Sequence, residues 1–339
     1  MTRRRTLSSL ALLGSLLVLG AACGRSEPAK PVEPPKKIPS IAVANYGAHP
    51  IIDVTLAAFQ ARLTELGYRN GENVQLHSSS VEGNVNLASQ MVSGLLAKGP
   101  DVIVAITTPI SQAVAKQARG KVPVVFCGVT DPIGAGLVSS WENTPGSGIT
   151  GTSDRWPYAE QLDLIKELVP KAKRIGIPLN SGESNSQYAL EQIRPLAQAR
   201  GLEVMTAVAT GVGEVRGAVD SLVRRGAQVI YAGSDNTVMA GFQSVLKVSH
   251  ERKIPVIVGE SANVERGGLA TYSVNYTELG RATADLVDKI LKGAEAGNLP
   301  VVTFKGATLY INPDAASKMG VKVPPDVLKR ATVVKTKEG

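Results

Sequence analysis

The sequence has 339 residues, of which 43% are hydrophobic and 19% are charged, as is typical of a globular chain long enough for two domains. Its formal net charge of +8 falls to +5 when Arg3, Arg4 and Arg5 are removed with the targeting segment described below. The remaining charge is dispersed and no basic stripe with interleaved aromatic residues occurs, so nucleic-acid binding is not expected.

Residues 1–23 have the order of a bacterial export signal. Arg3–Arg5 form the charged start, and Leu10–Leu19 form an apolar run that is too short to span a membrane. The small residues before Cys23 resemble the lipobox of bacterial lipoproteins, although Gly20 stands where leucine is usual. We therefore expect cleavage before an acylated Cys23, with an ordinary secreted protein as the alternative.

Residues 24–37 contain four prolines and several charges, and they are predicted to be a semi-extended tether. The other cysteine, Cys127, ends an apolar run, so we expect a small buried side chain rather than a disulfide partner of Cys23.

From Ile38 onward, short apolar runs alternate with helical patterns. In chain order, the first half is predicted to contain strands at Ile41–Ala44, Val74–Ser78, Asp101–Thr108 and Val122–Phe126, and helices at Ile52–Leu66, Asn84–Lys98 and Ile110–Arg119. The Gly- and Thr-rich stretch Thr144–Thr152 is interpreted as a domain boundary, and an amphipathic helix is predicted at Tyr158–Leu168.

The same series of elements then recurs. The offsets are 134 residues from Ile38 to Ala172, 127 from Asp101 to Gln228 and 132 from Val122 to Ile254. Matching order and spacing favour a duplicated α/β unit over a chance similarity in composition. The predicted fold class is therefore α/β, with two Rossmann-like lobes that have parallel sheets.

Three chain crossings are predicted to join the lobes into a hinge. We assign residues 38–152 and 275–305 to lobe 1, and residues 153–268 and 308–335 to lobe 2. The strand-like stretch Leu269–Val274 leads back to lobe 1, and Thr308–Met319 crosses again to lobe 2. Lobes joined in this way close on a ligand.

Small polar residues follow the apolar runs, and ligands of open parallel sheets bind at the carboxyl ends of the strands. Asp235 is the first choice for a ligand ammonium, with helix capping as the alternative. Thr107 and Thr108 precede a helix, whose N-terminus favours a carboxylate. The full set of predicted ligand-binding residues is Tyr46, His49, Thr107, Thr108, Thr130, Ser153, Asn180, Asn185, Ser234, Asp235, Asn236, Glu260 and Tyr272.

Several short motifs together resemble the ABC-transporter substrate-binding proteins of the tryptophan/tyrosine type. They are Thr108-Pro109, Thr130-Asp131-Pro132, Gly151-Thr152-Ser153-Asp154, Asn180-Ser181, Asn185-Ser186, Asp235-Asn236-Thr237, Gly259-Glu260 and Ala270-Thr271-Tyr272. The resemblance covers roughly residues 38–323 and implies a type I periplasmic-binding fold. It also implies a monomeric, lipid-anchored receptor outside the cytoplasm that passes a small, amino-acid-like and often aromatic ligand to a membrane permease.

Two positions depart from that family's usual pattern: Ala48 replaces a frequent Glu, and Ser234 replaces a frequent Thr. The sequence also leaves other functions open. An exported sensor of the same fold would serve a signalling partner, and an enzyme would need a catalytic constellation at Thr108, Asp131, Asp235 or Glu260. A sugar-responsive repressor would need a helix-turn-helix in place of the export signal.

The sequence contains no common catalytic motif, P-loop, H-E-x-x-H or C-x-x-C. Its three histidines, His49, His77 and His250, lie far apart in the sequence. We therefore expect a binding protein that has no metal and no cofactor.

Overall fold

The computed structural model describes residues 37–47 and 49–336. The predicted export signal, the Cys23 anchor and almost all of the tether lie outside the described residues, and residues from Ile38 onward form a compact unit. No described helix combines the length and the hydropathy that a membrane crossing needs.

The first sheet is built from β1 (Ser40–Asn45), β2 (Gln75–Ser80), β3 (Val102–Ile106), β4 (Val124–Cys127), β5 (Ile149–Ser153) and β11 (Val302–Thr303). These strands are all parallel and lie in the order β11-β5-β4-β3-β1-β2. The strands β1, β3 and β4 are mainly apolar and are buried along their whole length, as expected inside a parallel sheet, and β5 is equally buried.

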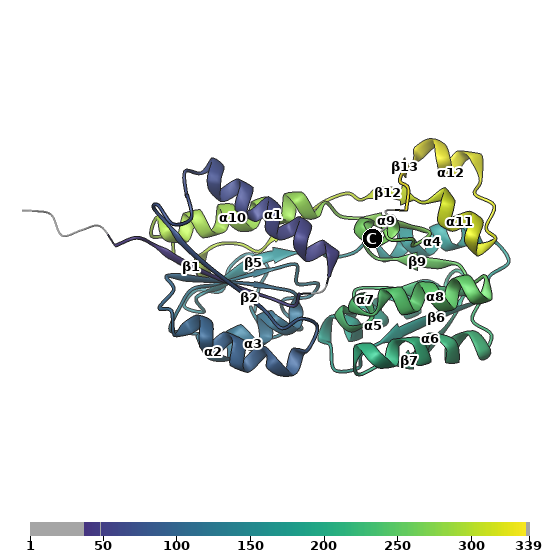
Figure 1. Cartoon of the computed structure of the whole chain (residues 1–339), viewed down its shortest axis with the longest axis horizontal. Helices are drawn as coiled ribbons and strands as arrows, with labels where there is room; N and C mark the ends of the chain where they lie inside the picture. The colour runs from purple at the N-terminus through teal and green to yellow at the C-terminus, as the bar shows by residue number, and fades with distance from the viewer. Residues whose placement is uncertain (1–36, 48, 337–339) are drawn as a thin grey trace, which may run out of the picture. The chain divides into compact units, whose positions relative to one another are not determined.

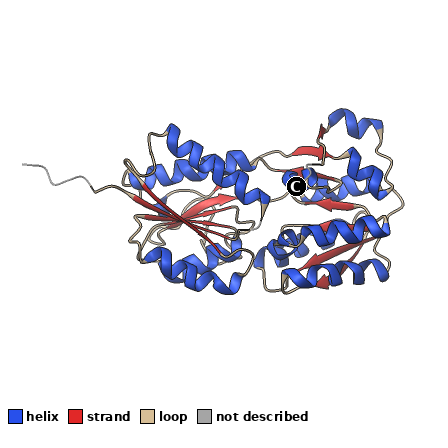
Figure 2. Cartoon of the chain, viewed as in Figure 1, coloured by secondary structure: helices blue, strands red, loops and turns tan. Residues whose placement is uncertain are grey.

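Helices cover both faces of the first sheet. One face carries α1 (Pro50–Glu65) and α10 (Tyr276–Leu291), and the other carries η1 (Val85–Leu87), α2 (Ala88–Leu96) and α3 (Thr108–Ala118) (Figures 1 and 2). The helices α1 and α10 pack closely at Gly280, where a Cβ atom would lie 2.2 Å from the carbonyl oxygen of Thr55.

The second sheet is built from β6 (Arg174–Leu179), β7 (Glu203–Val208), β8 (Val229–Ala232), β9 (Val256–Val258), β10 (Ala270–Ser273), β12 (Thr308–Ile311) and β13 (Thr332–Val333). Their order is β13-β12-β10-β9-β8-β6-β7, and only the β10–β12 pairing is antiparallel. Without β11 in the first sheet and β12 and β13 in the second, both sheets follow the same order. The topology thus agrees with the predicted duplication.

Two helix layers flank the second sheet. One layer contains α4 (Tyr158–Leu168) and α5 (Ser184–Gln198), and the other contains α6 (Val215–Arg224) and α8 (Phe242–Arg252). The remaining helices are η2 (Val212–Glu214), α7 (Asn236–Ala240), α9 (Ser261–Glu265), η3 (Ala296–Asn298), α11 (Pro313–Met319) and α12 (Pro325–Arg330). Each lobe has its own hydrophobic core.

The chain crosses between the sheets after β5, after β10 and after β11, so the prediction of three crossings is confirmed. The predicted boundary at Thr144–Thr152 is wrong in detail, because its last four residues, Ile149–Thr152, belong to β5 inside the first sheet. Gly151 lies so close to Phe126 that a Cβ atom would be 2.1 Å from its carbonyl oxygen. Ser153, assigned to lobe 2 from the sequence, pairs with Thr303 in the first sheet.

Candidate functional site

A cavity lies at the carboxyl ends of strands from both sheets. Its polar lining combines hydroxyls, amides, two carboxyl groups and one imidazole, and its apolar lining comes mainly from α1 and α10. The lining residues are His49, Ile51, Ile52, Thr55, Ile106, Thr107, Thr108, Cys127, Gly128, Thr130, Asp154, Trp156, Asn185, Ser234, Asn236, Glu260, Tyr276 and Leu279.

Thr107 joins β3 to α3 in a backbone conformation that favours glycine, with φ 82° and ψ 157°. Its amide donates to the Cys127 carbonyl oxygen at 3.0 Å, and its own carbonyl accepts from the Ser111 hydroxyl at 2.7 Å. These bonds hold the strained turn. The next amide, that of Thr108, is in the first turn of α3 and has no acceptor within the helix.

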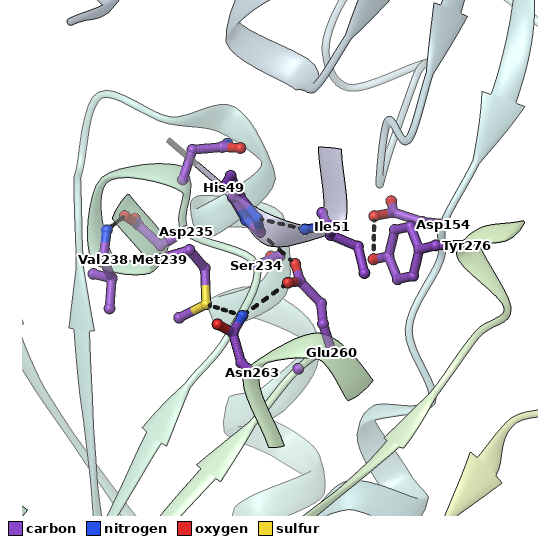
Figure 3. A network of polar contacts seen from close by, with 12 residues as sticks. His49, Ile51, Asp154, Ser234, Asp235, Val238, Met239, Glu260, Asn263 and Tyr276 are labelled. Atoms are coloured by element: carbon purple, nitrogen blue, oxygen red, sulfur yellow. Dashed lines mark hydrogen bonds and ion pairs between the residues drawn. The ribbon is translucent and has the colours of Figure 1, made fainter. Parts of the chain in front are cut away.

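Asp154 lies just after β5 and is buried in the cavity wall. Its carboxylate accepts a hydrogen bond from the Tyr276 hydroxyl at 2.8 Å (Figure 3). It also accepts from the Trp156 indole at 3.4 Å and the Thr130 hydroxyl at 3.3 Å. Burial raises the pKa of Asp154, while these donors act in the opposite direction.

A second carboxyl group, Glu260, lies between a histidine and an amide. Its Oε1 atom is 3.6 Å from His49 Nε2, and its Oε2 atom accepts from Asn263 Nδ2 at 3.0 Å (Figure 3). Burial, and then the nearby Asp154 charge, raise the pKa of Glu260 well above its usual range. The carboxyl pair therefore favours one negative charge over two.

His49 caps α1, because its Nδ1 atom accepts from the Ile51 amide at 3.4 Å. Burial, followed by the Arg266 charge, lowers the pKa of His49 to about 3. The neutral ring therefore carries its proton on Nε2, the atom that faces Glu260.

Besides Glu260, three polar side chains from the second sheet's side of the cavity line it: Asn185, Ser234 and Asn236. Asn185 donates to the Ser234 carbonyl oxygen at 2.7 Å. Glu183, which the sequence did not single out, accepts from both the amide and the side chain of Asn236, at 3.0 and 2.6 Å. It thereby positions Asn236 from behind without lining the cavity itself.

Asp235 is placed differently from its predicted role. It does not line the cavity, and its carboxylate accepts from the Val238 amide at 2.9 Å, the Asn180 amide at 2.5 Å and the Ser186 hydroxyl at 2.7 Å. The alternative of a helix cap is confirmed, because Asp235 is the N-cap of α7. Burial, and then the Glu183 charge, raise the pKa of Asp235.

Eight of the thirteen predicted residues line the cavity: His49, Thr107, Thr108, Thr130, Asn185, Ser234, Asn236 and Glu260. Besides Asp235, four others lie outside it. The Tyr46 hydroxyl donates to the Gly83 carbonyl oxygen at 3.1 Å, and Ser153 donates to the Thr130 carbonyl oxygen at 3.3 Å. Asn180 bonds to Thr237 at 2.9 Å, and Tyr272 lines another cavity beside Trp141.

Asp154, Trp156 and Tyr276 line the cavity but were not in the predicted set. Asp154 and Trp156 follow directly after β5, so a strand assignment for residues 149–153 would have located them. Tyr276 opens a helix far along the chain, and no local signal places it beside Asp154. Among the described residues, no group of three or more metal-binding side chains occurs.

Two topologically matched α/β lobes, three crossings and a cavity lined from both lobes are the architecture of the type I periplasmic-binding fold, which solute-binding proteins of ABC transporters share. Such proteins bind small ligands outside the cytoplasm and work with ABC permeases. The chain belongs to the ABC transporter substrate binding protein family, whose model matches residues 40–335.

Three similar proteins support this assignment. A tyrosine-binding protein of Clostridioides difficile is 32% identical over 287 residues, which are 85% of this chain and 82% of that protein. A conserved domain protein of Vibrio cholerae is 36% identical, with a TM-score of 0.85 over 88% of this chain and 100% of its own. An ABC domain of Streptococcus pneumoniae in complex with L-Trp is 33% identical, with a TM-score of 0.83 and the same coverage.

Proposed function

We propose that this chain is a lipid-anchored receptor that captures an aromatic amino acid, tyrosine or tryptophan, and delivers it to an ABC importer without chemical turnover. Cys23, which lies outside the described residues, is the proposed site of the anchor. Both the ligand class and the delivery step fit the family and the similar proteins that bind tyrosine and L-Trp.

The observation that carries the proposal is a set of three polar atoms. Thr107 Oγ1, Asn185 Oδ1 and Ser234 Oγ are buried and have no hydrogen-bond partner among the described residues. All three residues line the cavity. Since a buried polar group without a partner costs about 1–3 kcal/mol, three of them in one cavity favour a polar ligand that satisfies them.

The cavity offers a separate group for each charge of a zwitterionic ligand. A ligand ammonium is best served by Asp154, because the pKa of Glu260 is the more strongly raised and Asp154 is therefore the more readily ionised of the two cavity carboxyl groups. A ligand carboxylate is best served by the Thr108 amide and Thr107 hydroxyl at the N-terminus of α3.

The apolar part of the lining suits an aromatic side chain. Ile51, Ile52, Ile106 and Leu279 supply aliphatic surface, and the Trp156 ring supplies a planar one. Trp156 is held by its indole bonds to Asp154 and to the Tyr276 hydroxyl, at 3.4 and 3.2 Å. A rigid aromatic wall beside a carboxylate is a suitable arrangement for an aromatic amino acid.

The test is a thermal-shift screen of the purified protein against the twenty amino acids, simple sugars, purines and short peptides. A ligand at 100 times its dissociation constant adds about 2.7 kcal/mol to the free energy of unfolding, which raises the Tm visibly. A shift confined to tyrosine, tryptophan or phenylalanine supports the proposed ligand. A shift with a different compound class would overturn the ligand, and conversion of the bound compound on prolonged incubation would overturn the absence of turnover.

The anchor needs a separate test. Growth with a labelled fatty acid should label the wild-type chain and leave a Cys23→Ser variant unlabelled. Equal labelling of both would place the lipid elsewhere, and no labelling of either would favour an ordinary secreted protein.

A further inference from the structure

A second cavity on lobe 2 shares no lining residue with the ligand cavity. It lies between α8, α11 and the turn after α9, and four basic side chains contribute to it: Lys247, His250, Arg266 and Lys318. Gln243, Leu246, Glu251, Gly267, Ala315 and Thr336 complete its lining.

The charge in this cavity is unbalanced. Its one acidic lining residue, Glu251, is in an ion pair with Arg216 at 3.0 Å. Within residues 37–47 and 49–336, neither Lys247 nor Lys318 forms an ion pair. A concave surface lined by one sign of charge attracts the opposite ion.

His250 provides independent evidence for a bound partner. Its Nε2 atom is buried and has no hydrogen-bond partner in the described part of the chain. His250 and Lys318 line the same cavity, and burial, followed by the Lys318 charge, lowers the pKa of His250. An anion in the cavity would offset this charge and offer an acceptor for an imidazole N–H group.

Arg266 is fixed at the cavity wall. Its guanidinium group lies over the Phe242 ring, 5.5 Å from the centroid, and donates to Asn263 Oδ1 at 3.1 Å. No carboxylate of the described residues is paired with it. A preoriented guanidinium with unused donors is well suited to an oxyanion.

We propose that this cavity is a binding site for a small phosphate-type oxyanion, held by Arg266, Lys318, Lys247 and His250. The site is connected to the ligand cavity by polar contacts. Arg266 donates to Asn263, Asn263 donates to Glu260, and Glu260 faces His49. An anion that draws on the Arg266 charge therefore changes the electrostatic environment of Glu260 and His49.

The three histidines of the chain make a direct test possible. Inorganic phosphate is titrated into the purified protein at constant ionic strength while the three imidazole ring signals are followed by NMR. The His250 signal should move in a saturable way, the His49 signal should follow it through Arg266, and the His77 signal on β2 should stay fixed. Single His→Gln variants assign the signals.

Two lysine variants distinguish phosphate binding in the cavity from nonspecific attraction of phosphate to the positively charged surface. Lys318→Ala should weaken phosphate binding about tenfold or more, because it removes a charge that bonds to the ion. Lys171→Ala removes an equal charge from an exposed residue outside the cavity and should leave the affinity unchanged. Equal effects of the two variants, or a His250 signal that does not saturate, would overturn the proposed site.

Two further outcomes are decisive. A His250 shift without a His49 shift would refute the connection to the ligand cavity. Phosphatidylglycerol vesicles form a second arm of the experiment: if they bind the protein through Lys318 while free phosphate does not, the oxyanion is a lipid headgroup, and the assignment to a small ion is overturned.

Discussion

The Asp154→Asn variant tests the proposed ammonium site most directly. The substitution keeps the size of the side chain and removes its charge. Removing one partner of a buried, hydrogen-bonded charge pair typically costs about 2–5 kcal/mol, so the affinity for the amino acid should fall about 30-fold to 4,000-fold.

In the absence of ligand, the same substitution should change the stability of the protein only slightly. An asparagine oxygen still accepts from Thr130, and its amide group can donate to the Tyr276 oxygen, so mainly the Trp156 bond is lost. That loss is worth about 1 kcal/mol. Against it, burial disfavours the Asp154 charge, since it raises the pKa, and the neutral amide avoids that cost at pH 7. The Tm without ligand should therefore stay close to wild type.

Isothermal titration calorimetry with L-tyrosine and L-tryptophan measures the loss of affinity, and thermal unfolding measures the stability. Asp326→Asn is the matched control, because its side chain is 89% exposed on α12. Affinity within twofold of wild type in Asp154→Asn, with an unchanged Tm, would refute the ammonium role and leave Glu260 as the remaining carboxyl group in the cavity.

Three further predictions concern stability and the aromatic wall. Gly259→Ala should weaken binding of the amino acid about tenfold or more, as measured by calorimetry. The new Cβ atom would lie 1.6 Å from the Trp156 ring and must displace it, which costs about 1–3 kcal/mol. Gly217→Ala is the control, because no atom lies within 4 Å of its new Cβ atom, and an intact affinity in Gly259→Ala would show that the Trp156 position is unimportant. Asp235→Ala should lower the free energy of unfolding by about 2–5 kcal/mol in denaturant titrations, because three buried donors lose their acceptor, and a loss below about 1 kcal/mol would contradict the capping role. His49 has a pKa lowered from 6.5 to about 3, so its neutral form stabilises the fold above pH 6.5, and this contribution is lost as the pH falls toward 3. His49→Asn keeps a helix-capping residue but removes the imidazole that titrates. The free energy of unfolding of the wild type, relative to this variant, should therefore fall by up to about 1.4 kcal/mol per pH unit below pH 6.5. Parallel pH profiles of the two proteins would be inconsistent with a buried neutral His49.

Much of the fold could be predicted from local patterns. Apolar runs such as Val102–Ile106 and Val229–Ala232 are long enough for buried strands and end in polar residues, which fixes both the strand and the position of the site. Their regular spacing in the two halves predicted the duplication, and the three crossings followed from the order of the last elements.

The prediction from residue composition was wrong where tertiary packing, rather than local sequence, determines the secondary structure. Residues Ile149–Ser153 have the glycines and threonines of a loop, yet they form a central strand. The structure explains this, because the crowded contact with Phe126 needs Gly151, and the Thr152 hydroxyl is 3.1 Å from the Thr283 hydroxyl on α10. A partner 131 residues away cannot be inferred from the local sequence.

At the site, residue types along single segments were enough to predict which strand ends carry polar groups. Which carboxylate faces the ligand cavity depends on contacts between distant segments and could not be predicted in this way. Both Asp235 and Asp154 accept three hydrogen bonds, but only Asp154 lies in the cavity wall. The position of a buried charge relative to the cavity depends on segments that are far apart in the sequence and that only folding brings together.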